Sequence, residues 1–168
     1  MLIGEGGVGK TSFIQRVMGM EFNNYYVATN GGQVHNLLVN TNQGSVNFEL
    51  WDTAGQELPG PLRDEYYENL HAAFLMFDLH SVVTYKEMKK WHRDVCRAHP
   101  HVPFVLIANK ADGEPRVQEQ LINLHRRVPN MSYVRMSVKY NETAVLFAPL
   151  LSVAEELMGL EAGTLRIE

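Results

Sequence analysis

The chain has 168 residues, of which 45% are apolar and 20% are charged, a composition typical of one globular domain with a sizeable core. Its formal net charge of −4 argues against direct nucleic-acid binding, because a protein that contacts many phosphates needs a basic surface. The single cysteine, Cys96, excludes an internal disulfide and a cysteine-based metal cluster, and the apolar runs are too short to span a bilayer.

The first elements follow the order strand, glycine-rich loop, helix and strand pair. Leu2–Ile3 predicts a short first strand, and apolar residues at helical spacing predict a helix over residues 10–20. Two strands are expected within residues 34–51, on either side of the turn sequence NTNQG. The second of these strands alternates strictly between apolar and polar positions, and its apolar residues are Val46, Phe48 and Leu50.

The remainder of the chain alternates further strands with helices. Two continuously apolar runs and one shorter run predict strands, at residues 72–78, 104–110 and 133–137. Apolar residues at helical spacing predict helices, at residues 84–98, 144–158 and, more weakly, 117–127.

Alternation of strands and helices predicts an α/β fold, with an open, mostly parallel six-stranded sheet and helices on both of its faces. We expect one domain over residues 1–160 and a short C-terminal tail over residues 161–168. In such sheets, ligands bind beyond the carboxyl ends of the strands. Four polar loops follow predicted strands, so we expect them to meet at one edge of the sheet and to form one site.

The first of these loops is GEGGVGKT, which matches the pattern G-x-x-x-x-G-K-[ST]. Its glycines let the backbone wrap closely, so that N–H groups and the start of the helix face phosphate oxygens. Lys10 would reach the outer phosphates, and the Thr11 hydroxyl would bind Mg²⁺. A plain glycine-rich turn is the alternative, but a chance match has odds on the order of one in a few hundred. The predicted phosphate site comprises Gly4, Glu5, Gly6, Gly7, Val8, Gly9, Lys10 and Thr11.

The sequence NKAD follows the apolar run at residues 104–110 and predicts which base is bound. The Asp112 carboxylate could accept two hydrogen bonds from guanine N1–H and N2–H₂, a donor pair that adenine lacks. Lys110 can lay its stem along the base, and Asn109 can tie this loop to neighbouring strands. The backbone after the last predicted strand could donate to guanine O6, from Ser137, Val138 and Lys139.

The sequence WDTAGQE supplies further parts of the site. Asp52 could hold Mg²⁺ through water, because Mg²⁺ keeps most of its hydration shell. The Gly55 N–H could meet a γ-phosphate, and Gln56 falls where it could orient an attacking water. Thr29 could close over the same Mg²⁺ with its hydroxyl. We therefore predict Thr11, Thr29 and Asp52 as metal ligands, and Lys10, Thr29 and Gln56 as catalytic residues.

These residues together resemble the small Ras-like GTPases, and within them the Ran family. The segments EFNNYYVATNGGQVH, WDTAGQE…LRDEYY, VTYKEMKKWHRD and NKADG are similar to Ran in order and spacing. The resemblance implies the G domain of the P-loop NTPases, with GTP or GDP and Mg²⁺ as ligands. It also implies slow GTP hydrolysis that an activating protein accelerates and nucleotide exchange that an exchange factor promotes.

The same resemblance implies a role as a switch in nucleocytoplasmic transport. A monomer in the nucleus and cytoplasm would bind importin-β-type receptors in its GTP form and release them after hydrolysis. By this resemblance, Phe22 would pack against the base and Tyr26 would lie over the catalytic region. We expect no lipid anchor and no membrane attachment, because the chain opens with ML and ends with TLRIE.

The chain differs from the Ran pattern in several places, so we expect a divergent member. In the second switch segment, Leu58, Pro59 and Pro61 replace a lysine, an aromatic residue and a glycine, and prolines stiffen a segment that must move. Val138 stands where a small alanine is usual. Two alternatives stay open: a GTP-binding scaffold that does not cycle, and a small GTPase of another soluble trafficking or signalling branch.

Overall fold

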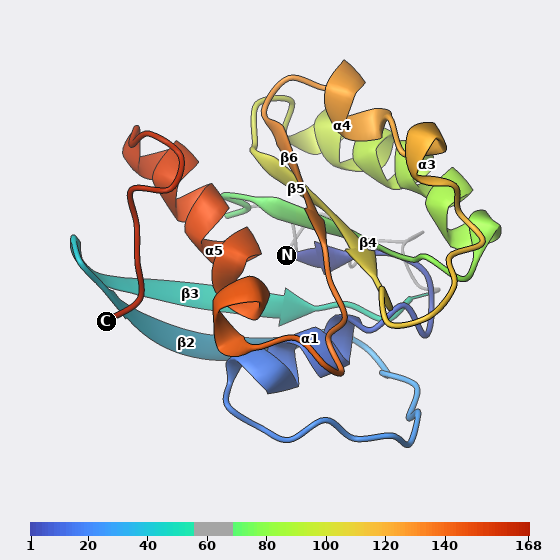
Figure 1. Cartoon of the computed structure of the whole chain (residues 1–168). Helices are drawn as coiled ribbons and strands as arrows, with labels where there is room; N and C mark the ends of the chain where they lie inside the picture. The colour runs from blue at the N-terminus through green and yellow to red at the C-terminus, as the bar shows by residue number, and fades with distance from the viewer. Residues whose placement is uncertain (56–68) are drawn as a thin grey trace.

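The computed structural model describes residues 1–55 and 69–168. In this part of the chain, six strands form one sheet with the order β2-β3-β1-β4-β5-β6 (Figure 1). The strands are β1 Leu2–Ile3, β2 Gln33–Thr41, β3 Gly44–Asp52, β4 Ala73–Asp78, β5 Phe104–Asn109 and β6 Met131–Arg135. Only the β2–β3 hairpin is antiparallel, and the other neighbouring pairs among these strands are parallel. The predicted α/β fold with a mostly parallel sheet is confirmed.

Helices cover both faces of the sheet (Figure 1). The helices are α1 Lys10–Val17, α3 Val82–Ala98, α4 Leu124–Arg127 and α5 Thr143–Met158, with a 3-10 turn η1 at Glu119–Leu121. Alternate residues of β4 enter two separate cores: Leu75 packs with α3, whereas Met76 packs with α1 and α5. The continuous apolar run of this strand therefore reflects burial on both faces, as predicted.

Helix α1 ends at Val17, so the prediction of a helix up to residue 20 was wrong. Gly19 adopts a left-handed φ of 83°, a conformation that glycine enters without a steric cost. Its N–H donates to the Arg16 carbonyl at 3.1 Å, and the Met20 N–H donates to the Gln15 carbonyl at 2.9 Å. This pair of bonds forms a Schellman motif, which satisfies the last carbonyls of the helix and turns the chain away.

The helix predicted over residues 117–127 was also wrong, because two short pieces, η1 and α4, stand in its place. The buried residues here are Val117, Ile122 and Leu124, a spacing that one continuous helix face does not provide. The Asn123 N–H donates to the Tyr85 hydroxyl at 2.9 Å, so a bond to α3 replaces a helical one. Strand β6 begins at Met131, two residues before the predicted position.

The last residues pack on the domain. Leu165 is buried, and its N–H donates to the Glu155 carboxylate at 2.7 Å. Ile167 forms an antiparallel bridge with Thr41, and the Glu168 N–H donates to the Asn40 carbonyl at 3.1 Å. These contacts lie at the end of β2, on the edge that faces away from β3. Across residues 1–55 and 69–168, no helix is long and apolar enough to cross a membrane.

The parallel arrangement decides where the loops meet. Strands β1, β3, β4, β5 and β6 all point the same way, so the loops that follow them gather at one edge of the sheet. Four of these loops carry residues that the sequence predicts as binding or catalytic. The geometry at this edge therefore tests those predictions.

Candidate functional site

A cavity of about 620 Å³ lies at the carboxyl edge of the sheet. Its walls come from five segments, around residues 6–15, 22–30, 53–55, 109–112 and 137–139. Most predicted site residues line this cavity, whereas Gly4, Val8 and Asp52 are buried and do not line it, and Glu5 is half-buried outside it. The prediction for Gln56 lies outside the described residues, as do those for Leu58, Pro59 and Pro61 in the second switch segment.

The glycine-rich loop between β1 and α1 depends on glycine at both of its ends. Gly4 and Gly9 have φ values of 151° and 107°, which residues with side chains rarely adopt. A Cβ atom at Gly4 would lie 2.2 Å from the Met76 carbonyl oxygen, and one at Gly9 would lie 2.4 Å from Asn109 Nδ2. The loop therefore presses its backbone against β4 and β5, and Lys10 begins α1 directly after Gly9.

Lys10 points back across this loop and is 6% exposed. Its Nζ donates to the carbonyl oxygens of Gly4 at 2.7 Å and Glu5 at 3.0 Å. Burial lowers the pKa of Lys10 to about 8, although the Asp52 and Glu5 carboxylates act in the opposite direction. The ammonium is thus fixed at the rim of the loop, where an anion held by the loop would meet it.

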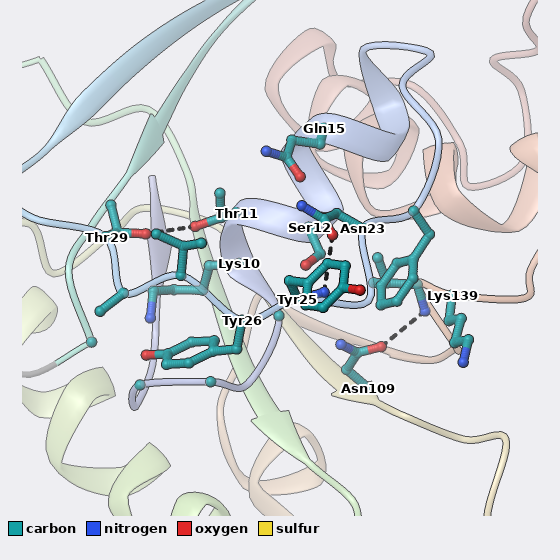
Figure 2. A pocket seen from close by; sticks show the side chains of 18 of the residues that line it. Lys10, Thr11, Ser12, Gln15, Asn23, Tyr25, Tyr26, Thr29, Asn109 and Lys139 are labelled. Carbon is teal, nitrogen blue, oxygen red and sulfur yellow. Dashed lines mark hydrogen bonds between the residues drawn. The ribbon is translucent and has the colours of Figure 1, made fainter.

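Three oxygen-bearing side chains meet beside the loop, those of Thr11, Thr29 and Asp52, and Figure 2 shows the first two of them. The hydroxyl oxygens of Thr11 and Thr29 are 2.7 Å apart, and the Thr11 hydroxyl donates to Asp52 Oδ2 at 2.6 Å. Asp52 is 1% exposed, and its Oδ1 atom is buried and has no hydrogen-bond partner among the residues that the structure describes. Burial raises the pKa of the Asp52 carboxyl, while the Thr11 hydrogen bond and Lys10 lower it.

This arrangement fits Mg²⁺. Mg²⁺ is a hard cation that takes oxygen ligands, keeps several waters and needs only one or two carboxylates. Asp52 supplies one carboxylate with a spare buried acceptor, and the two threonines supply hydroxyls. In residues 1–55 and 69–168, no cluster of three or more His, Cys, Asp or Glu side chains offers an all-protein metal centre. The structure thus brings together the three residues predicted as metal ligands.

Gly55 contacts the glycine-rich loop backbone to backbone. A Cβ atom at this position would lie 2.2 Å from the Gly6 nitrogen, so no side chain fits between the two segments. Tyr26 lies across the same loop, and its hydroxyl would be 3.6 Å from a Cβ atom at Gly6 (Figure 2). The tyrosine is 71% exposed and therefore covers the loop from the solvent side.

Asn109 ties three segments of the site together. Its Nδ2 donates to the Val8 carbonyl at 2.8 Å, and its Oδ1 accepts the Val138 N–H at 3.0 Å (Figure 2). The side chain is 3% exposed. The sequence predicted that Asn109 ties its loop to neighbouring strands, but its amide group instead fixes two loops, the glycine-rich loop and the loop after β6.

The remaining predicted residues surround the other end of the cavity. Asp112 Oδ1 accepts a hydrogen bond from the Ser137 hydroxyl at 2.6 Å, which orients the carboxylate. Lys139 Nζ lies 5.8 Å from the centroid of the Phe22 ring, within the range of a cation–π contact. Phe22 and Asp112 both line the cavity. An aromatic face and an oriented carboxylate therefore lie at the end of the cavity that is away from Thr11.

Two contacts of the site were missed by the sequence reasoning. Trp91 packs in the core, and its Nε1 also donates to the Glu5 carboxylate at 3.2 Å. Nothing in the sequence links two residues that lie 86 positions apart. Lys110 Nζ forms an ion pair with Asp78 Oδ2 at 2.7 Å. Here a signal existed, because Asp78 is an acidic residue at the carboxyl end of a buried strand.

Comparison with known protein families identifies the family of the chain. A model of the Ras family matches residues 1–152, which include every site residue described above. The match is to the Ras family as a whole and carries nothing specific to its Ran branch.

Proposed function

The chain belongs to the Ras family of small GTPases, whose members bind GTP or GDP with Mg²⁺ and hydrolyse GTP. From this premise we propose that it is a guanine-nucleotide switch that controls nucleocytoplasmic transport. The observation that carries the proposal is the contact between Thr29, in the loop before β2, and Thr11, at the start of α1. A loop without regular secondary structure and a phosphate site that share one contact can respond to the same ligand.

The residues of the loop and of α1 would hold the phosphates. Backbone N–H groups and the helix start would face the anion, and the Lys10 ammonium, held by the Gly4 and Glu5 carbonyls, would add a positive charge. Mg²⁺, when bound, would neutralise negative charge on the phosphates. Gly55 would donate its N–H to the outermost phosphate, and Gln56 would orient the attacking water. Thr29, whose hydroxyl meets that of Thr11, would face the outer phosphate region from the other side.

The far end of the cavity supports guanine as the base. The Asp112 carboxylate, oriented by Ser137, offers two acceptor oxygens to the N1–H and N2–H₂ donors of guanine. The Val138 N–H is already used by Asn109, so a donor to guanine O6 would come from another amide of the same loop. Phe22 would pack against the base, with Lys139 beside it.

The transport role rests on the resemblance of four long segments to Ran, and one surface feature supports a partner at the switch. Tyr25, Tyr26 and Val27 are 84%, 71% and 76% exposed, an apolar stretch directly before Thr29. Hydrophobic side chains gathered on one loop are typical of interaction sites. We therefore propose importin-β-type receptors as partners of the GTP form, together with an exchange factor and an activating protein, in the nucleus and the cytoplasm.

A pull-down in two nucleotide states tests this proposal. The chain is loaded with GDP or with a non-hydrolysable GTP analogue and is offered to an immobilised importin-β-type receptor. We expect the GTP-analogue form to bind at least ~100-fold more tightly. Equal binding by the two forms, both shown to be folded and loaded, would contradict the transport role and leave a small GTPase of another branch.

Single-turnover GTP hydrolysis separates the switch from a scaffold that does not cycle. Slow turnover that an activating protein accelerates is the expected result for a switch. Absence of turnover, with and without an activating protein, would favour the scaffold. In that outcome guanine-nucleotide binding would still be present, so the two functions are distinguishable on the same preparation.

A further inference from the structure

The carboxylate of Asp78 lies beside the base end of the cavity but does not line it. Strand β4 ends at Asp78, which is paired in register with Asn109 of β5. Asp78 Oδ2 accepts a hydrogen bond from Lys110 Nζ at 2.7 Å, and Oδ1 accepts the His80 N–H at 2.8 Å. The Asp78 side chain is 14% exposed, so this charge-assisted bond is largely shielded from solvent.

Residues 78–80 also support the loop that carries Lys110 and Asp112. The Leu79 N–H donates to the Asn109 carbonyl at 3.0 Å, and the Leu79 carbonyl accepts the Arg116 N–H at 2.9 Å. A Cβ atom at Gly113 would lie 2.7 Å from His80 Nε2, so the imidazole ring packs directly on the loop backbone. The loop is thus held by this segment on both sides of Asp112.

Lys110 itself has an unusual backbone conformation, with a φ of 64°. A lysine in the left-handed region is uncommon and persists only where its surroundings hold it there. Lys110 lines the cavity while its ammonium is bound to Asp78, so its aliphatic stem is held along the cavity wall. Without Asp78, the ammonium would turn toward water, as exposed lysines do.

We propose that Asp78 is a positioning residue for base recognition, which acts by fixing the stem of Lys110 against the flat face of the purine. This inference rests on the guanine nucleotide proposed above. The stem contacts a ring face that guanine and hypoxanthine share, whereas Asp112 reads the N2 amine that only guanine carries. Loss of Asp78 should therefore weaken both bases equally and leave the choice between them unchanged.

The test measures dissociation rates of fluorescently labelled GDP and IDP. Asp78→Asn keeps an acceptor for the His80 N–H but removes the charge, and it should accelerate release of both nucleotides by about tenfold. In a chain that already carries Lys110→Met, adding Asp78→Asn should accelerate nucleotide release by less than about twofold, because the residue through which Asp78 acts is already absent. A matched control is Glu87→Gln, which removes an exposed ion pair with Lys90 and should change neither rate.

Several outcomes would overturn the inference. The first is an unchanged release rate in Asp78→Asn. The second is a tenfold effect of Asp78→Asn that persists when Lys110 is already replaced by methionine. The third is a lower preference for GDP over IDP, which would indicate general loosening of the loop. If Asp78→Asn does not fold, Asp78→Ser is the second variant, and the same changes in release rate are expected for it. If the wild-type chain retains neither nucleotide, the proposed function fails together with this inference. If it retains GDP and Asp78→Asn behaves like wild type, only this inference fails.

Discussion

The Thr29 hydroxyl lies 2.7 Å from the Thr11 hydroxyl, although 18 positions of sequence separate the two residues. Thr11 belongs to a rigid helix start, whereas Thr29 belongs to a loop with no regular secondary structure. The contact closes this loop over the site next to Asp52. Two ligands that place different numbers of oxygen atoms here stabilise this loop conformation to different extents. A partner that binds the loop would therefore bind the two liganded forms with different affinities.

Thr29→Ala should therefore narrow the difference in receptor affinity between the GTP-analogue form and the GDP form. The substitution removes the hydroxyl that closes the loop, so we expect the affinity ratio to fall by about tenfold. Titration of the receptor against both loaded forms measures it. Thr29→Ser keeps the hydroxyl and serves as the control. A ratio unchanged in Thr29→Ala would show that the loop closes without this contact.

Asp112→Asn should change which base the site accepts. An amide in place of the carboxylate presents a donor where guanine also donates, and the mismatch should weaken GTP binding by roughly 2–4 kcal/mol. Xanthosine nucleotides carry an acceptor at that position and should bind the variant better than GTP does. Competition between the two nucleotides measures the preference. Glu114→Gln, two residues away and exposed, is the control, and unchanged GTP affinity in Asp112→Asn would remove Asp112 from the base site.

Gln56→Leu tests the residue that the sequence predicts for water positioning. Its contribution is made mainly in the transition state, so GTP binding should stay nearly intact while hydrolysis falls. Single-turnover assays should show lower rates both with and without an activating protein. A variant that hydrolyses GTP at the wild-type rate would assign water positioning to another residue.

Nucleotide binding should take up a proton at alkaline pH. Burial lowers the pKa of Lys10 to about 8 in the nucleotide-free chain, so most of its amine is neutral at pH 9. Phosphate oxygens favour the ammonium and raise its pKa again, which means that binding at pH 9 should take up about one proton and binding at pH 7 much less. GDP affinity should accordingly fall as the pH rises through 8. Calorimetry in buffers of different ionisation enthalpy measures the uptake, and equal uptake at the two pH values would contradict the assignment to Lys10.

Much of the fold was predictable because its signals are local. The continuous apolar runs of β4 and β5 follow from burial of both faces of these strands, and the alternating pattern of β3 follows from burial of one face. One error arose where a tertiary contact replaces a local one, and the other where a local glycine stop ends a helix before its apolar spacing does. The bond from Asn123 to the Tyr85 hydroxyl breaks the helix that periodicity suggests, and a left-handed Gly19 ends α1 early.

The site was predictable to the extent that its residues belong to short motifs. Thr11, Asp52 and Asn109 come from three separate motifs, and the parallel sheet brings them together. The bond between Glu5 and Trp91 was not predictable, because the sequence around Trp91 shows only the apolar spacing of a helix. The ion pair of Asp78 with Lys110 requires the register of β4 against β5, which the sequence does not state.

The side chain of Asn109 also decides how the pocket opens. The Val8 carbonyl and the Val138 N–H both bond to this one amide, so neither loop can move far without leaving a buried polar group unsatisfied on the other. The two ends of the pocket therefore belong to one cooperative opening unit. Protection of the Val138 amide from hydrogen exchange should then report the same opening free energy as displacement of the glycine-rich loop, so ligand release and local unfolding of this corner would be coupled.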